Sequence, residues 1–136
     1  MPFVVDASVA LSWLIDADRT PTTDRLLDRA AQEGIVAPSI LGYEIANRLG
    51  RAVRTGELSR DQVRELLRAF GALDLDTVRP DVIVLTETSA DTGLTAYEAA
   101  YLEVAKARGI PLATLDVRLR DAALATGVTV LPAPEP

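Results

Sequence analysis

The chain has 136 residues, of which 49% are hydrophobic and 25% charged, and its formal net charge is −6 at pH 7. This length fits a single domain with a buried core, which we place at residues 1–132, followed by a loose tail at residues 133–136. The acidic charge argues against binding nucleic acid through bulk electrostatics, although a local basic stripe can still bind it. Histidine and cysteine are absent, which excludes imidazole and thiolate chemistry and leaves carboxylate chemistry.

We expect neither a signal peptide nor a membrane-spanning helix in this sequence. The start, MPFVVDAS, lacks the basic segment and long apolar stretch of a signal peptide. No apolar run approaches the roughly 18 residues that a membrane-spanning helix needs. The absence of cysteine fits a reducing compartment. We therefore expect a soluble, cytoplasmic protein with no membrane partner.

The first part of the chain alternates short apolar strands with longer helices. A glycine ends the second helix, and a Ser59–Gln62 capping box begins the fourth. The expected elements are a strand at residues 3–6, a helix at 8–15, a helix from Thr22 or Thr23 to about 32, a strand at 35–37, a helix at 39–54 and a helix at 59–73.

The second part continues the alternation with one ambiguous segment. Residues 81–89 contain VIVL, which favours a strand, but Pro80 and the polar residues that follow also favour the start of a helix. The other expected elements are a strand at residues 74–78, a helix at 95–108, a strand at 112–115, a helix at 118–125 and a strand at 128–131.

Alternation of this kind is typical of βαβ crossovers. It predicts an α/β fold with a short, mainly parallel central sheet of four to five strands and helices on both faces. In such sheets, ligands bind beyond the carboxyl ends of the strands, near the point where the strand order reverses.

Four carboxylates are placed where they could meet at that edge. Asp6 and Asp116 each follow an expected strand, and Glu44 and Glu98 each lie about one turn inside an expected helix. Carboxylate oxygens that converge form a site for a hard cation, which favours Mg²⁺ or Mn²⁺.

Each carboxylate also has a purely structural interpretation, which the residues alone leave open. Asp6 and Asp116 could cap the helices that follow them. Glu44 could pair with Arg48 or Arg51 on the surface of its own helix. Glu98 follows Thr95 by three residues, which is the spacing of a capping box.

The sequence resembles the PIN-domain ribonucleases and, among them, the VapC-type toxins of bacterial toxin–antitoxin pairs. The segments that carry the resemblance follow one another in family order over nearly the whole chain. They are FVVDASVALSWL, APSILGYEIANRL, LTAYEAAYLEVAKARGIPLATLDVRL and VTVL.

The resemblance implies a PIN-like fold, with residues 81–90 helical, and a divalent-metal-dependent endoribonuclease that uses Mg²⁺, with Mn²⁺ as a substitute. It also implies a homodimer and a cognate VapB-type antitoxin whose tail lies across the groove. The positions that match the family's metal ligands are Asp6, Glu44, Glu98 and Asp116, and those that match its supporting residues are Ser8, Asn47 and Thr114. The family usually has Asp where this chain has Glu98, whose extra methylene displaces the carboxylate by about 1.5 Å.

Two alternatives remain open from the sequence. Arg48 and Arg51 lie near Glu44 and could contact RNA, or they could belong to a solvated helix face. The chain could also be a degenerate PIN domain that binds RNA or a protein partner without cleavage.

A phospho-accepting receiver domain is excluded, because Asp6 has no acidic neighbour and the only lysine, Lys106, lies within a helix.

Overall fold

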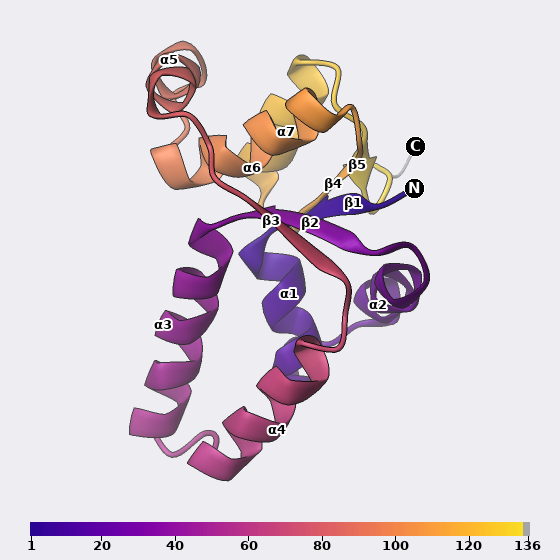
Figure 1. Ribbon diagram of the computed structural model, residues 1–136, viewed down its shortest axis with the longest axis vertical. Helices are drawn as coiled ribbons and strands as arrows, with labels where there is room; N and C mark the ends of the chain where they lie inside the picture. Colours follow the sequence, from indigo (N-terminus) through magenta and orange to yellow (C-terminus); the bar gives the residue numbers. More distant parts are fainter. Residues whose placement is uncertain (135–136) are drawn as a thin grey trace.

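The computed structural model describes residues 1–134 and shows a central parallel sheet with helices on both faces (Figure 1). The sheet has five strands in the order β3-β2-β1-β4-β5, and all neighbouring strands pair in parallel. The strands are β1 (Phe3–Val5), β2 (Ile35–Pro38), β3 (Leu75–Val78), β4 (Leu112–Ala113) and β5 (Val130–Leu131).

The helices form two groups, one on each side of the sheet (Figure 1). One group is α1 (Ala7–Leu14), α2 (Pro21–Glu33), α3 (Ile40–Arg54) and α4 (Arg60–Phe70), with a short 3-10 turn at Asp16–Asp18 after α1. The other group is α5 (Val82–Thr92), α6 (Ala96–Arg108) and α7 (Val117–Ala125). This arrangement confirms the predicted fold class.

The strand order reverses between β1 and β4. The chain builds β1, β2 and β3 outward in one direction and then crosses back to place β4 on the other side of β1. Val4 of β1 therefore pairs with Val36 on one side and Leu112 on the other. The backbone N–H of Asp6 donates to the carbonyl of Ala113 at 3.1 Å, so the residues that follow β1 and β4 emerge side by side.

The core is centred on β1, whose three residues are completely buried. Such a strand is typical of a parallel sheet covered on both faces. Helix α6 packs against β1 and β2 from one side, and α1 contacts α2, α3 and α4 on the other. The polar residue that follows β1, Asp6, is buried as well, with 5% of its surface exposed.

Several predicted boundaries were wrong, and local hydrogen bonds explain most of them. The ambiguous segment is a helix over Val82–Thr92, as the family resemblance implied, because the side chain of Asp81 caps the N–H groups of Ile83 (2.7 Å) and Val84 (3.4 Å). Helix α2 begins at Pro21, since Thr20 and Thr23 form a reciprocal capping box in which the cap residue, Thr20, lies two or three residues before the expected one. Helix α4 ends at Phe70, and strands β4 and β5 have only two residues each.

Among the described residues, no helix combines the length and apolar character that crossing a bilayer requires. Of the predicted loose tail, residues 135–136 lie outside the described part of the chain.

Replacing Leu102 with Ala should lower the free energy of unfolding by about 2–5 kcal/mol, because it leaves a cavity in the core. Leu102 is completely buried on α6, whereas Leu124 on α7 is 45% exposed. The matched change Leu124→Ala should therefore alter stability by less than about 0.5 kcal/mol. Urea unfolding of both variants measures the difference, and equal losses would contradict this description of the core.

Candidate active site

A pocket of about 190 Å³ lies where β1 and β4 end, between the amino-terminal parts of α3 and α6. Four acidic side chains, one hydroxyl and two tyrosines contribute to its wall. The lining residues are Asp6, Ala7, Ser8, Glu44, Tyr97, Glu98, Tyr101, Asp116 and Leu119. The structure thus brings the four carboxylates singled out from the sequence to one pocket.

Asp6 lies at the bottom of this arrangement, at the corner between β1 and α1. Its Oδ1 accepts hydrogen bonds from the Ser8 hydroxyl at 2.6 Å and from the Val9 N–H at 3.1 Å, so Asp6 caps α1. Its Oδ2 accepts a hydrogen bond from the Thr114 hydroxyl. Burial raises the pKa of the Asp6 carboxyl above its usual value, against the lowering effect of these donors, and the nearby charge of Asp116 raises it further.

The two hydroxyls that contact Asp6 also hold the loop that follows β4. The Ser8 hydroxyl accepts a hydrogen bond from the Leu115 N–H at 2.9 Å, and the Thr114 hydroxyl accepts one from the Asp116 N–H at 3.0 Å. A hydroxyl can donate and accept at once, which is what this bridging position requires. Ser8 and Thr114 therefore fix the position of Asp116 relative to Asp6.

Asp116 is the N-cap of α7. Its Oδ1 accepts from the backbone N–H groups of Arg118 at 2.9 Å and Leu119 at 3.4 Å. The capping role considered from the sequence is therefore present. The Asp116 side chain thus both caps α7 and lines the pocket.

Glu44 is held by a contact that the sequence analysis missed. Its Oε1 accepts a hydrogen bond of 2.6 Å from the hydroxyl of Tyr101, a buried residue of α6. Burial, and then the hydrogen bond to Glu44, hold the pKa of the Tyr101 phenol far above its usual range, so it remains a donor. The available signal was helical spacing, because Tyr101 lies three residues after Glu98 and so on the same side of α6.

Glu98 forms the predicted capping box at the start of α6. Its Oε1 accepts from the Thr95 N–H at 3.0 Å, while its own N–H donates to the Thr95 hydroxyl at 3.1 Å. Glu98 is only partly buried at the edge of the pocket.

Capping and metal binding are compatible at these positions, because a carboxylate has two oxygens. The hydrogen bonds of Glu44, Glu98 and Asp116 all use a single oxygen of each side chain. Within residues 1–134, the second oxygen of each accepts no hydrogen bond and forms no ion pair. Three carboxylate oxygens thus remain available to a ligand.

The chemistry of the donor set fits a hard divalent cation. The polar side chains of the pocket are carboxylates and hydroxyls, and its described lining contains no basic residue that would neutralise them. No group of three or more acidic side chains in the described chain is already close enough together to enclose an ion. Binding a cation therefore requires these side chains to converge.

Four other candidate residues do not line the pocket. Thr114 lies beside it and donates to Asp6. Asn47 and Arg51 are exposed on α3. Arg48 does not form the alternative ion pair with Glu44, because its guanidinium binds both oxygens of Glu57 at 3.1 Å.

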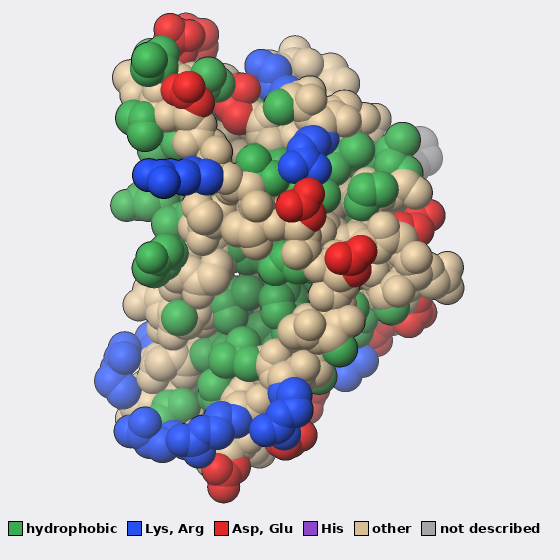
Figure 2. Space-filling view, in the orientation of Figure 1, with side chains coloured by type: hydrophobic (Ala, Val, Ile, Leu, Met, Phe, Trp, Pro, Cys, Tyr) green, Lys and Arg blue, Asp and Glu red, His purple; other side chains and the backbone are tan. Residues whose placement is uncertain are grey.

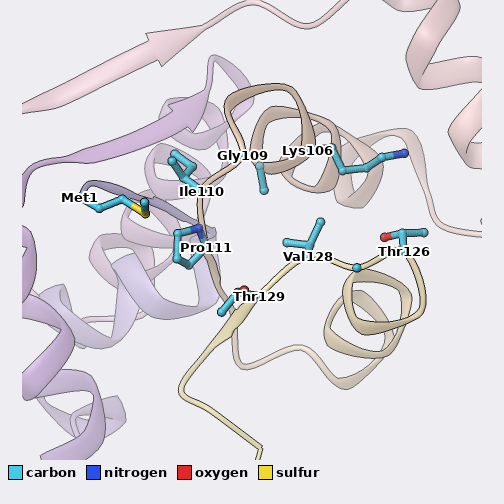
Figure 3. A pocket seen from close by; sticks show the side chains of 10 residues that line it. Met1, Lys106, Gly109, Ile110, Pro111, Thr126, Val128 and Thr129 are labelled. Carbon is cyan, nitrogen blue, oxygen red and sulfur yellow. The ribbon is translucent and has the colours of Figure 1, made fainter.

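A larger pocket, of about 430 Å³, lies at the opposite end of β4 (Figure 3). Its described lining includes no carboxylate, and its one lysine, Lys106, pairs with Glu103 at 3.4 Å. This pocket therefore offers no acidic side chain as a ligand for a cation, unlike the carboxylate pocket.

Comparison with known proteins indicates the family to which the chain is similar. The sequence pattern of the family described as PIN domain matches residues 3–124. Ribonuclease VapC9 of Mycobacterium tuberculosis is 33% identical over 132 residues, which cover 95% of this chain and 98% of the relative. Ribonuclease VapC3 of Pyrobaculum aerophilum is 29% identical over 125 residues, which cover 89% of this chain and 94% of the relative.

Solved structures show the same fold. PAE2754 of Pyrobaculum aerophilum superposes with a TM-score of 0.74 at 22% identity, over 96% of this chain and 84% of that chain. VapBC2 of Rickettsia felis, solved with a DNA fragment from its promoter, gives a TM-score of 0.69 at 13% identity, over 96% of this chain and 97% of that chain. From its sequence pattern, its relatives and its fold, the chain belongs to the PIN-domain family.

Proposed function

We propose that this protein is the toxin of a VapBC-type toxin–antitoxin pair and acts in the cytoplasm as a divalent-metal-dependent endoribonuclease. The single observation that carries the proposal is that Asp6, Glu44, Glu98 and Asp116 line one pocket at the reversal of strand order. Relatives that cover almost the whole chain are named ribonucleases, which supports RNA as the substrate.

Asp6 and Asp116 would hold Mg²⁺, or Mn²⁺ in its place, together with Glu44 and Glu98. When bound, such an ion stabilises negative charge on the phosphodiester and makes the attacking water easier to deprotonate. The rest of the arrangement comes from the protein. Ser8 and Thr114 orient Asp6 and set the loop of Asp116, and Tyr101 orients Glu44.

The side chains also explain why no protein nucleophile is required. The pocket has no histidine or cysteine, since the chain contains neither. Of the three hydroxyls in its lining, those of Ser8 and Tyr101 are engaged with Asp6 and Glu44, and the third belongs to the exposed Tyr97. Direct attack by water on the phosphorus is therefore the reaction that suits this pocket.

Two partners belong to the proposal. A cognate VapB-type antitoxin is supported by the structural neighbour VapBC2 of Rickettsia felis. A homodimer is supported by α5, on which Val82 is 74% exposed and Ile83 is 68% exposed. Figure 2 shows hydrophobic side chains on the surface where Figure 1 places α5. Neighbouring exposed apolar residues are typical of an interaction surface.

Replacing Asp6 or Asp116 with Asn should abolish cleavage of an unstructured RNA in Mg²⁺ or Mn²⁺, because each change removes an anionic ligand. The fold should survive without metal, and its stability should hold or rise, since the change relieves repulsion among like charges. A gel assay of cleavage, with a chelator as negative control, measures the effect. Wild-type rates in both variants would remove these residues from the mechanism.

The same variants separate the nuclease from a degenerate PIN domain. Millimolar Mn²⁺ should raise the melting temperature of the wild-type protein by mass action, and the rise should shrink in both variants. A wild-type protein that neither cleaves RNA nor shifts its melting temperature with metal would favour the non-catalytic alternative.

Glu98→Gln should lower cleavage while leaving the melting temperature nearly unchanged, because the amide oxygen of Gln can accept the hydrogen bond from the Thr95 N–H. Glu98→Asp, which restores the residue type usual in the family, should keep or raise cleavage. Both variants are compared in the same assay and by thermal melting. A silent Gln variant together with a damaged Asp variant would leave a three-carboxylate site.

Replacing both Val82 and Ile83 with Asp should convert the proposed homodimer into monomers, because it places charges in an apolar contact. Light scattering during size-exclusion chromatography measures the mass of each species. The paired change Val117→Asp with Leu124→Asp is the control, since both residues are exposed on α7. Loss of the dimer in the control alone would move the interface away from α5.

A further inference from the structure

The hairpin formed by α3 and α4 has a charge opposite to that of the rest of the chain. Residues 48–68 contain six arginines and three acidic residues, a net charge of +3, within a chain whose net charge is −6; the remainder therefore carries −9. Basic side chains line the lower edge of the molecule in Figure 2, where Figure 1 places the end of this hairpin. The acidic average thus conceals a local basic surface.

Ion pairs divide these arginines into two groups. Arg48 binds Glu57, Arg64 binds Asp61 at 3.1 Å, and Arg68 binds Glu65. The other three form no ion pair with any described residue, and all are exposed. They are Arg51, Arg54 and Arg60.

Two of the unpaired arginines lie beyond Glu44 on α3. At 3.6 residues per turn, Arg51 lies about 20° from Glu44 around the helix and so shares its side, whereas Arg54 lies about 80° away, at the edge of that side. At a rise of about 1.5 Å per residue, they lie roughly 10 and 15 Å from Glu44 along the helix axis. Glu44 lines the pocket, and the two arginines are exposed beyond it.

Helix stability accounts for only part of this set. Arg51 and Arg54 lie in the last turn of α3, where a cation interacts favourably with the helix dipole. Arg60 is the first residue of α4, where the same dipole disfavours a cation. A ligand that crosses the end of the hairpin explains all three residues together.

We propose that Arg51, Arg54 and Arg60 form a phosphate-binding track that holds an RNA strand several nucleotides away from the bond being cut. The inference rests on the proposed function, because it takes the strand to enter the carboxylate pocket. Stacked nucleotides advance about 3.4 Å each, so a strand of a few nucleotides spans the distance from Glu44 to the arginines. Arg48, which the sequence suggested as an RNA contact, is excluded from the track because Glu57 already binds it.

The test is the salt dependence of RNA binding, measured in chelator so that no cleavage occurs. A short, unstructured, fluorescein-labelled RNA is titrated with the full chain across a series of KCl concentrations, and anisotropy reports binding. The double variant Arg51→Gln with Arg54→Gln should reduce the log–log salt slope by about 1.4 and weaken binding about twentyfold at 0.1 M salt, because each lost phosphate contact contributes about 0.7. Arg60→Gln should reduce the slope by about half as much.

The matched control is Arg64→Gln with Arg68→Gln, which removes the same charge from the same hairpin at ion-paired positions. This control should change the slope much less than the track variant does. Arg51→Lys with Arg54→Lys should restore most of the wild-type slope, and thermal melting verifies that every variant folds.

Each outcome has a distinct meaning. The track would be overturned if the salt slope changed equally in the track variant and the control, or changed in neither. It would also be overturned if the track variant bound RNA normally but no longer bound an acidic protein partner. A wild-type protein that binds RNA through these arginines but does not cut it in Mn²⁺ would leave the track standing and refute the nuclease.

Discussion

The burial of one carboxylate, that of Asp6, determines how the rest of the site is built. Asp6 follows the fully buried strand β1, so its side chain lies in the interior of the protein. Burial opposes the ionisation of this carboxyl, and the nearby charge of Asp116 opposes it further. Two hydroxyls and one backbone N–H stabilise the carboxylate, and none of them carries a positive charge. A bound cation would supply a positive charge, and its attraction would offset the burial of the carboxylate.

Hydrogen bonds orient the other three acidic side chains and leave one oxygen of each available to a ligand. Asp116 caps α7 and Glu98 caps α6 through one oxygen each, and Tyr101 binds one oxygen of Glu44. Each hydrogen bond limits the rotation of a flexible side chain before any ligand arrives. The loss of side-chain entropy on binding a metal is therefore smaller than for free surface acids. The same hydrogen bonds stabilise the helices that carry the site.

The sequence predicted the parts of the site that depend on local pattern. Asp6 and Asp116 followed from the ends of apolar strands, and the Thr95–Glu98 capping box followed from spacing. Contacts between distant segments could not be read in this way. The bond from Tyr101 to Glu44 joins residues 57 positions apart, and the capture of Arg48 by Glu57 depends on how the α3–α4 hairpin folds. Helix α5 was ambiguous because strand propensity in VIVL competes with the cap from Asp81.

We propose that the four carboxylates converge on a divalent cation at the reversal of strand order. Anomalous X-ray diffraction from crystals grown with Mn²⁺ tests it most directly, because it locates the ion independently of any activity. We predict a manganese peak about 2.0–2.2 Å from carboxylate oxygens of Asp6 and Asp116, with Glu44 and Glu98 turned toward it directly or through water. A well-ordered crystal that binds Mn²⁺ elsewhere, or leaves this pocket without a peak at saturating Mn²⁺, would contradict the account.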